Sequence, residues 1–119
     1  MDDPLPAALS VDPDTKVAGS GIDALATALL LGDVRRFLTV PGSPATRLAD
    51  ALVARGAEVI NAHDEKTAIE TALGLALVGV RAGVIAKGNG GLVLAEALQN
   101  AGPHEIGGLL VLLGDDPAD

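Results

Sequence analysis

Short apolar runs alternate with longer segments of helical periodicity along most of this chain. The short runs are aliphatic and bounded by turn residues, which predicts strands at 36–40, 57–61, 82–86 and 108–113. The longer segments predict helices at 20–32, 43–56, 65–79 and 91–100. Helices interleaved with nearly continuous apolar strands are typical of βαβ units. The predicted fold is therefore α/β, an open parallel sheet of about four strands with helices on both faces.

Helix boundaries can be predicted from capping residues. Ser20 with Asp23 three positions later forms a capping-box pattern, and Gly32 suits the end of that first helix. In the second helix, Ser43 occupies a predicted N-cap and Pro44 the first helical position. Both patterns place a loop directly before a helix.

The predicted helix at 65–79 is apolar around most of its circumference. Such a helix is expected to be buried on nearly all sides. In a chain of 119 residues this suggests that another subunit covers the outer face. The small residues Ala72, Gly74 and Ala76 would allow that subunit to approach closely.

Length and composition indicate one folded domain. The chain has 119 residues, 49% of them apolar, which is enough for a single core. Residues 1–16 carry several Asp and Pro without a hydrophobic period, and we expect a flexible leader there, followed by the α/β domain at 17–119.

The charge and residue usage exclude several classes of function. Sixteen acidic against eight basic residues give a net charge of −8, which disfavours nucleic acid and anionic lipid as partners. Phe37 is the single aromatic residue, and there is no cysteine for disulfides or thiolate chemistry. Neither a signal-peptide pattern nor a membrane-length apolar run is present, so a cytoplasmic location is expected.

Polar loops follow each of the four predicted strands. Ligands of open parallel sheets bind beyond the carboxyl ends of the strands, where such loops meet. We therefore expect one shared site built from the loops at 41–44, 61–65, 87–91 and 114–117.

Each polar residue in these loops also has a structural interpretation. Glu65 fits a first-turn acid that interacts favourably with the helix dipole, and Ser43 fits a simple helix entrance. Lys87 followed by Gly-Asn-Gly-Gly fits a tight turn as well as a phosphate cradle, since the spacing is not that of a P-loop. His63 and His104 form no recognisable metal motif, so no metal site is predicted within the chain.

Three segments in register resemble one known domain family. They are VPGSP at 40–44, DEKTAIETALGLALVGVRAGVIAKGNGG at 64–91 and GDDP at 114–117. From about Ser20 to its C-terminus the chain resembles the pyrimidine-binding (PYR) domain of thiamine-diphosphate enzymes. Within that family it is similar to the branch of indolepyruvate:ferredoxin oxidoreductase α subunits. It also resembles sulfopyruvate, phosphonopyruvate and benzoylformate decarboxylases.

The resemblance assigns the cofactor-activating glutamate of the family to Glu65. In the family this glutamate hydrogen-bonds N1′ of the aminopyrimidine and favours the imino tautomer, which deprotonates C2 of the thiazolium. The activated carbon attacks a 2-oxoacid carbonyl, and the cofactor serves as the electron sink. Thiamine diphosphate is thus the implied cofactor and a small 2-oxoacid the implied substrate.

The remaining site residues also follow from the resemblance. It implies that Pro41 and Gly42 contact the cofactor. Ser43 matches a loop position that contacts the substrate carboxylate in related decarboxylases. Lys87 falls where relatives place a polar residue facing the intermediate, and its charge suits an anionic oxoacid. Asn89 is expected on the substrate side as well.

One module of the family has no counterpart in this sequence. The diphosphate-binding domain carries a Gly-Asp-Gly motif and a distant Asn for Mg²⁺, whereas the chain has Gly114-Asp115-Asp116. We therefore expect a partner subunit to hold Mg²⁺ and the diphosphate, in a homo- or hetero-oligomer. The chain stops just after the fourth predicted strand, which suggests a truncated domain or a small subunit.

Three functional hypotheses follow. The first is the PYR component of a split 2-oxoacid decarboxylase (lyase) or oxidoreductase, active only with a diphosphate-binding partner. The second is a non-catalytic α/β interaction or regulatory module that retains the PYR fold. The third, a small nucleotide-binding protein that uses the Gly88–Gly91 loop, fits least well because its glycine spacing matches no nucleotide motif.

Overall fold

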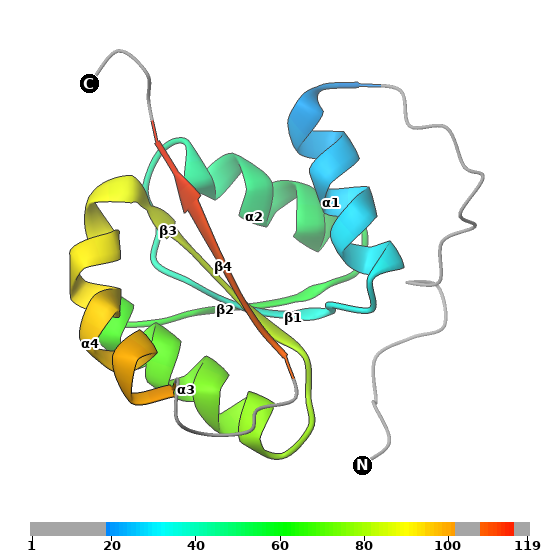
Figure 1. Cartoon of the computed structure of the whole chain (residues 1–119). Coiled ribbons are helices and arrows are strands. Elements are labelled where there is room, and N and C mark those ends of the chain that lie inside the picture. Colours follow the sequence, from blue (N-terminus) through cyan, green and yellow to red (C-terminus); the bar gives the residue numbers. More distant parts are fainter. Residues whose placement is uncertain (1–18, 102–107, 116–119) are drawn as a thin grey trace.

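Helices and parallel strands alternate in the computed structural model, which describes residues 19–101 and 108–115 (Figure 1). The elements are α1 Gly21–Leu31, β1 Arg36–Thr39, α2 Ala45–Ala54, β2 Glu58–Asn61, α3 Glu65–Leu77, β3 Ala82–Lys87, the 3₁₀ turn η2 Gly88–Gly90, α4 Gly91–Ala101 and β4 Leu109–Gly114. Every predicted helix and strand is confirmed, with ends that shift by at most a few residues. The predicted leader at 1–16 lies outside the described residues.

The four strands form one parallel sheet in the order β2-β1-β3-β4. Thr39 of β1 is level with Asn61 of β2 and with Ile85 of β3, and Lys87 of β3 is level with Gly114 of β4. The carboxyl ends of all four strands therefore lie at the same edge. This confirms the predicted α/β fold with a parallel sheet.

Alternate residues of the strands pack into two separate hydrophobic cores, one on each face of the sheet. Phe37 and Ile85 pack under α1 and α2, whereas Leu38 and Val84 pack under α3 and α4. Figure 1 shows these helix pairs on opposite sides of the strands. The alternation follows from the two-residue period of a strand, which sends neighbouring side chains to opposite faces.

The single aromatic side chain is accommodated by a glycine on the neighbouring strand. Phe37 is fully buried, and its register partner on β3 is Gly83. A Cβ at Gly83 would lie only 2.7 Å from Cδ1 of Phe37. Gly83 therefore provides the space that this large ring requires.

The capping predictions have different outcomes for α1 and α2. Ser20 and Asp23 form the predicted capping box, and Gly32 is the C-cap of α1. The predicted N-cap role of Ser43 is wrong, because α2 has its N-cap at Pro44 and no side-chain cap. The turn closes instead through Thr46, whose hydroxyl accepts a hydrogen bond from the Gly42 amide at 2.9 Å. Ser43 is left exposed in the turn.

The burial predicted for α3 is also wrong for this chain by itself. Its buried residues, Ala68, Ile69, Ala72 and Ala76, lie on the sheet-facing side. Leu77 at its end remains 54% exposed. Ala72 and Ala76 pack into the core of this chain, so they cannot provide close approach to a neighbour, and only Gly74 of the predicted trio is exposed. Coverage of the outer face by another subunit stays a prediction.

Several other large apolar side chains are exposed near the ends of helices. Val78 after α3 is 60% exposed, and Leu92 at the start of α4 is 89% exposed. None of the helices within residues 19–101 and 108–115 has the length and hydrophobicity needed to cross a membrane. The predicted cytoplasmic location stays a prediction.

Candidate functional site at the carboxyl edge of the sheet

The loops of the carboxyl edge approach one another closely at three glycines. A Cβ at Gly42 would lie 3.4 Å from Cβ of Lys87, so the loop after β1 packs on the end of β3. A Cβ at Gly88 would lie 2.9 Å from Cγ of Asp115. A Cβ at Gly114 would lie 3.0 Å from the Ala45 amide nitrogen. Loops that are distant in the sequence are thus joined into one surface, as far as the fourth loop is described.

Glu65 lies at this edge as the first residue of α3. Its side chain is half-buried against the η2 turn, since a Cβ at Gly90 would lie 2.8 Å from Cγ and 3.0 Å from Oε1 of Glu65. Gly90 therefore allows the turn to approach the carboxylate closely. Ile69, Ala72 and Ala76 on the same helix are buried, as the predicted spacing requires.

Glu65 is an acid in the first turn of α3, as its helix-dipole interpretation requires, but it is not the cap of the helix. The N-cap of α3 is Asp64, whose carboxylate accepts a hydrogen bond from the Thr67 amide at 2.7 Å. That backbone hydrogen bond, aided by the Thr67 side chain, lowers the pKa of Asp64. Within the described residues the Glu65 carboxylate has no hydrogen bond or ion pair. Its oxygens are thus available to a ligand.

The residues predicted on the substrate side surround the same surface. Lys87 is half-buried at the end of β3 with its aliphatic stem against Gly42, and Asn89 is exposed in η2. Lys87 and Glu65 lie at opposite ends of η2, because Lys87 precedes the turn and Glu65 contacts Gly90 at its end. Ser43 is exposed and forms no hydrogen bond with any described residue.

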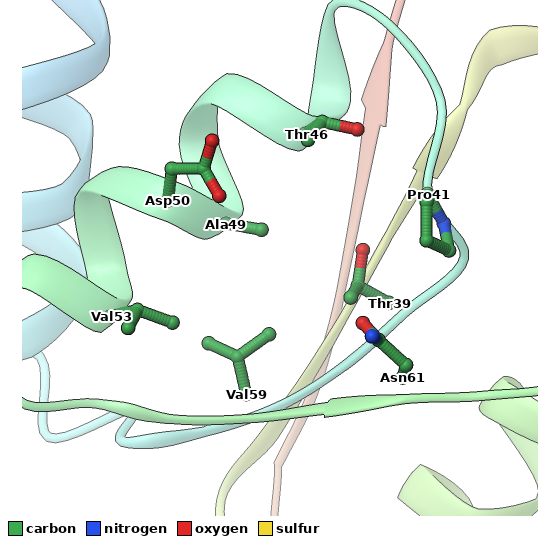
Figure 2. A pocket seen from close by; sticks show the side chains of 8 residues that line it. All are labelled: Thr39, Pro41, Thr46, Ala49, Asp50, Val53, Val59 and Asn61. Atoms are coloured by element: carbon green, nitrogen blue, oxygen red, sulfur yellow. The ribbon is translucent and has the colours of Figure 1, made fainter.

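A separate cavity of about 280 Å³ lies between α2 and the carboxyl ends of β1 and β2 (Figure 2). Its polar lining comes from Thr39, Thr46, Asp50 and Asn61, and its apolar lining from Pro41, Ala49, Val53 and Val59. Of these residues, Pro41 was predicted from the sequence to contact the cofactor, and Asn61 belongs to the loop at 61–65 that was expected to contribute to a shared site. A polar Thr39 at the end of β1 is a further local signal in this region.

The described residues contain no group of three or more His, Cys, Asp or Glu side chains that could hold a metal ion. This finding covers residues 19–101 and 108–115, so Asp116 and His104 are outside it. The predicted support of Mg²⁺ by a partner subunit is not tested by it.

Sequence comparison identifies the family. The family described as "Thiamine pyrophosphate enzyme, N-terminal TPP binding domain" matches residues 20–118. The chain belongs to this family. Thiamine pyrophosphate (TPP) is thiamine diphosphate, so the match confirms the predicted resemblance to thiamine-diphosphate enzymes. It also agrees with the all-parallel α/β fold of this TPP-binding domain.

The TPP-binding domain is similar to a small part of several curated proteins. The protein named "Indolepyruvate oxidoreductase subunit IorA" from Thermococcus kodakarensis is 35% identical over 111 residues, which cover 89% of this chain and 17% of that protein. The Pyrococcus horikoshii and Pyrococcus abyssi proteins of the same name are 33% and 29% identical over the same shares. The chain thus spans less than a fifth of the length of these relatives. No solved structure matches.

Proposed function

We propose that this TPP-binding domain is the PYR component of a TPP-dependent enzyme that acts on a 2-oxoacid, and that Glu65 activates the cofactor. The observation that carries the proposal is the placement of Glu65. Its half-buried carboxylate lies at the carboxyl edge of the sheet, against Gly90, and has no hydrogen bond to any described residue. The resemblance to the TPP-binding family implies a glutamate at this position, beside the aminopyrimidine ring of the cofactor.

The residues present fit the pyrimidine end of the cofactor. Glu65 would share a proton with N1′ of the aminopyrimidine, which is a general acid–base role. Pro41 and Gly42, in the loop after β1, would flank the ring. When bound, TPP supplies a nucleophilic thiazolium carbon and an electron sink. The η2 turn lies close to the Glu65 side chain at Gly90, and this packing would restrict the side chain and so help to preorganise the carboxylate for proton transfer.

Lys87 would bind the carboxylate of the 2-oxoacid. Contact of its stem with Gly42 holds the side chain at the site edge, and an ammonium group attracts an anionic substrate. The exposed Ser43 and Asn89 would supply hydrogen bonds on the same side. The name shared by the curated relatives supports an oxidoreductase, with decarboxylation as the other outcome of the same chemistry.

The diphosphate and Mg²⁺ would be held by a diphosphate-binding domain on a partner subunit, in a hetero-oligomer. The support for this is the word "subunit" in the shared name of the curated relatives. Tight binding of TPP is then a property of the assembly.

The first test is the Glu65→Gln variant in the assembled enzyme. Glutamine keeps the size of the side chain but cannot share a proton with N1′. General acid–base catalysis is typically worth about 10²–10⁴-fold, so we expect turnover of a 2-oxoacid to fall at least about 100-fold. Calorimetry with TPP and Mg²⁺ should show binding with the diphosphate-binding subunit and none with the chain alone.

Glu70→Gln is the matched control, since Glu70 is an exposed acid on the same helix. It removes the same charge and should leave turnover unchanged. Unchanged turnover in the assembled Glu65→Gln enzyme would sink the assignment of Glu65. Failure of the folded chain to bind TPP with any diphosphate-binding partner would favour the non-catalytic interaction module.

A further inference from the structure

The cavity between α2 and the ends of β1 and β2 shares Pro41 with the proposed cofactor contacts but does not include Glu65 or Lys87 in its lining. We propose that it is a second binding site, for a small ligand that carries an ammonium group on a short aliphatic body. Its volume of about 280 Å³ lies just below the roughly 300–1,000 Å³ of sites for drug-sized ligands. The cavity therefore has the size of a small metabolite. The inference does not depend on the proposed function.

Polar groups converge on this cavity from three elements. Thr39 and Asn61 are register partners at the ends of β1 and β2, so their side chains leave the same face of the sheet. Thr46 and Asp50 are four residues apart on α2 and therefore share one helix face. Figure 2 shows the four side chains around a common space. Convergence of separate segments is typical of a built binding site.

The hydrogen-bonding capacity of the polar wall is partly used and partly available. Thr39 donates its hydroxyl proton to the Ile85 carbonyl at 3.0 Å, which leaves its oxygen as an acceptor. Thr46 accepts from the Gly42 amide, which leaves its proton to be donated. The Asp50 carboxylate and the side-chain amide of Asn61 form no hydrogen bond with any described residue. The wall thus offers mainly acceptors to a ligand.

The charge of the lining favours a cation. Among the eight described residues that line the cavity, Asp50 is the charged one. A carboxylate with neighbouring neutral oxygens suits an ammonium group, which has three donors and no acceptor. The net charge of −8 further favours cations over anions near the surface.

The apolar side chains of the lining suit an aliphatic body. Val53, Val59 and Ala49 face the space from α2 and β2. Val53 is 56% exposed, so a ligand in the cavity would remove its apolar surface from water. The Asp50 carboxylate beside the aliphatic side chains of Val53 and Ala49 favours an amine with a short hydrocarbon chain.

The test is an NMR titration of the full chain, labelled with ¹⁵N, without TPP. The probes are 3-methylbutylamine, 3-methylbutan-1-ol and 3-methylbutanoate, which share a body and differ in charge. We expect the amine to shift the amide signals of Thr46, Asp50, Val53 and Asn61. The alcohol should bind more weakly and the acid should not bind. Higher salt should weaken binding of the amine, because salt screens exposed charges.

Asp50→Asn should weaken binding of the amine about twofold to fivefold, since it removes the charge of an exposed carboxylate, whose ion pairs are weak. Glu70→Gln makes the same change in net charge on a helix of the opposite face and should have no effect. The proposal is overturned if the amine shifts no cavity signal, or if the three probes bind equally. It is also overturned if Glu70→Gln weakens binding as much as Asp50→Asn.

Discussion

At the residue scale, glycines are placed where a side chain would collide with a neighbour. Gly90 leaves room for Glu65, and Gly83 leaves room for the ring of Phe37. Other glycines have no such neighbour; Gly74, in the exposed part of α3, has nothing within 4 Å of an added Cβ. The same substitution is therefore expected to have opposite effects at different positions.

Gly83→Ala should destabilise the fold, and Gly74→Ala should stabilise it. The added Cβ at position 83 would lie 2.7 Å from the buried Phe37 ring, and overpacking of this kind costs about 1–3 kcal/mol. At position 74, alanine removes the entropic cost of glycine within a helix, a gain of about 0.5–1 kcal/mol. Denaturant unfolding measures both values. Equal effects at the two sites would contradict this account of Gly83.

At the element scale, α3 connects the fold to the site. Asp64 caps its first turn, Glu65 faces the ligand edge, and the apolar residues that follow anchor the helix on the sheet. The cap and the proposed catalytic acid are adjacent residues, and the proposal gives them separate tasks. Stability and function at this helix start can therefore be changed independently.

The cap makes the stability of the fold sensitive to acid. The pKa of Asp64 is lowered in the folded chain by the hydrogen bonds from Thr67, relative to its usual value of 3.8. Its stabilising contribution is thus present above pH 3.8 and is lost as the pH falls through the lower, folded pKa. Asp23, whose pKa is lowered mainly by the Ser20 amide, adds to the same acid loss.

Asp64→Asn should reduce this acid sensitivity. Asparagine is a good N-cap but does not titrate, so the melting temperature should stay near that of the wild type at pH 7 and fall less between about pH 5 and pH 2. Asp64→Ala, which removes the cap, should melt at a lower temperature already at pH 7. An acid loss in Asp64→Asn equal to that of the wild type would show that Asp64 does not contribute.

At the scale of the whole molecule, the proposed site lies at the carboxyl edge of the sheet, and an exposed apolar region lies at the end of α3. Leu77 and Val78 are 54% and 60% exposed. The proposed partner subunit would cover such side chains, because burial of apolar surface drives association. The prediction that another chain covers α3 is thus kept for the exposed residues at the end of this helix.

Leu77→Gln should weaken binding of the diphosphate-binding subunit about fivefold or more, since full burial of a leucine side chain is worth about 1.5–3 kcal/mol and about 1.4 kcal/mol is tenfold in affinity. Leu31→Gln is the control, because Leu31 is 41% exposed at the end of α1, on the opposite face of the sheet. It should leave the dissociation constant unchanged. Calorimetric titrations that give equal constants for both variants would exclude the end of α3 from the interface.

The sequence alone was sufficient for the fold class, the order of the elements and the family. Strand and helix periods, and caps such as Ser20 with Asp23, arise from residues close together in the chain, so they can be recognised without coordinates. The same is true of the segment around Glu65, whose likeness to the TPP enzymes the family comparison bears out. The catalytic role of Glu65 itself stays a prediction.

The tertiary structure alone decided how distant residues meet. The close approaches of Gly90 to Glu65 and of Gly42 to Lys87 depend on how the strands are paired. A local sequence pattern does not contain this pairing. The same holds for the cavity at Asp50 and Asn61, because no local pattern links a residue of α2 to the end of β2. Sequence patterns report the neighbours of a residue along the chain, whereas a site requires side chains from different elements to occupy one space.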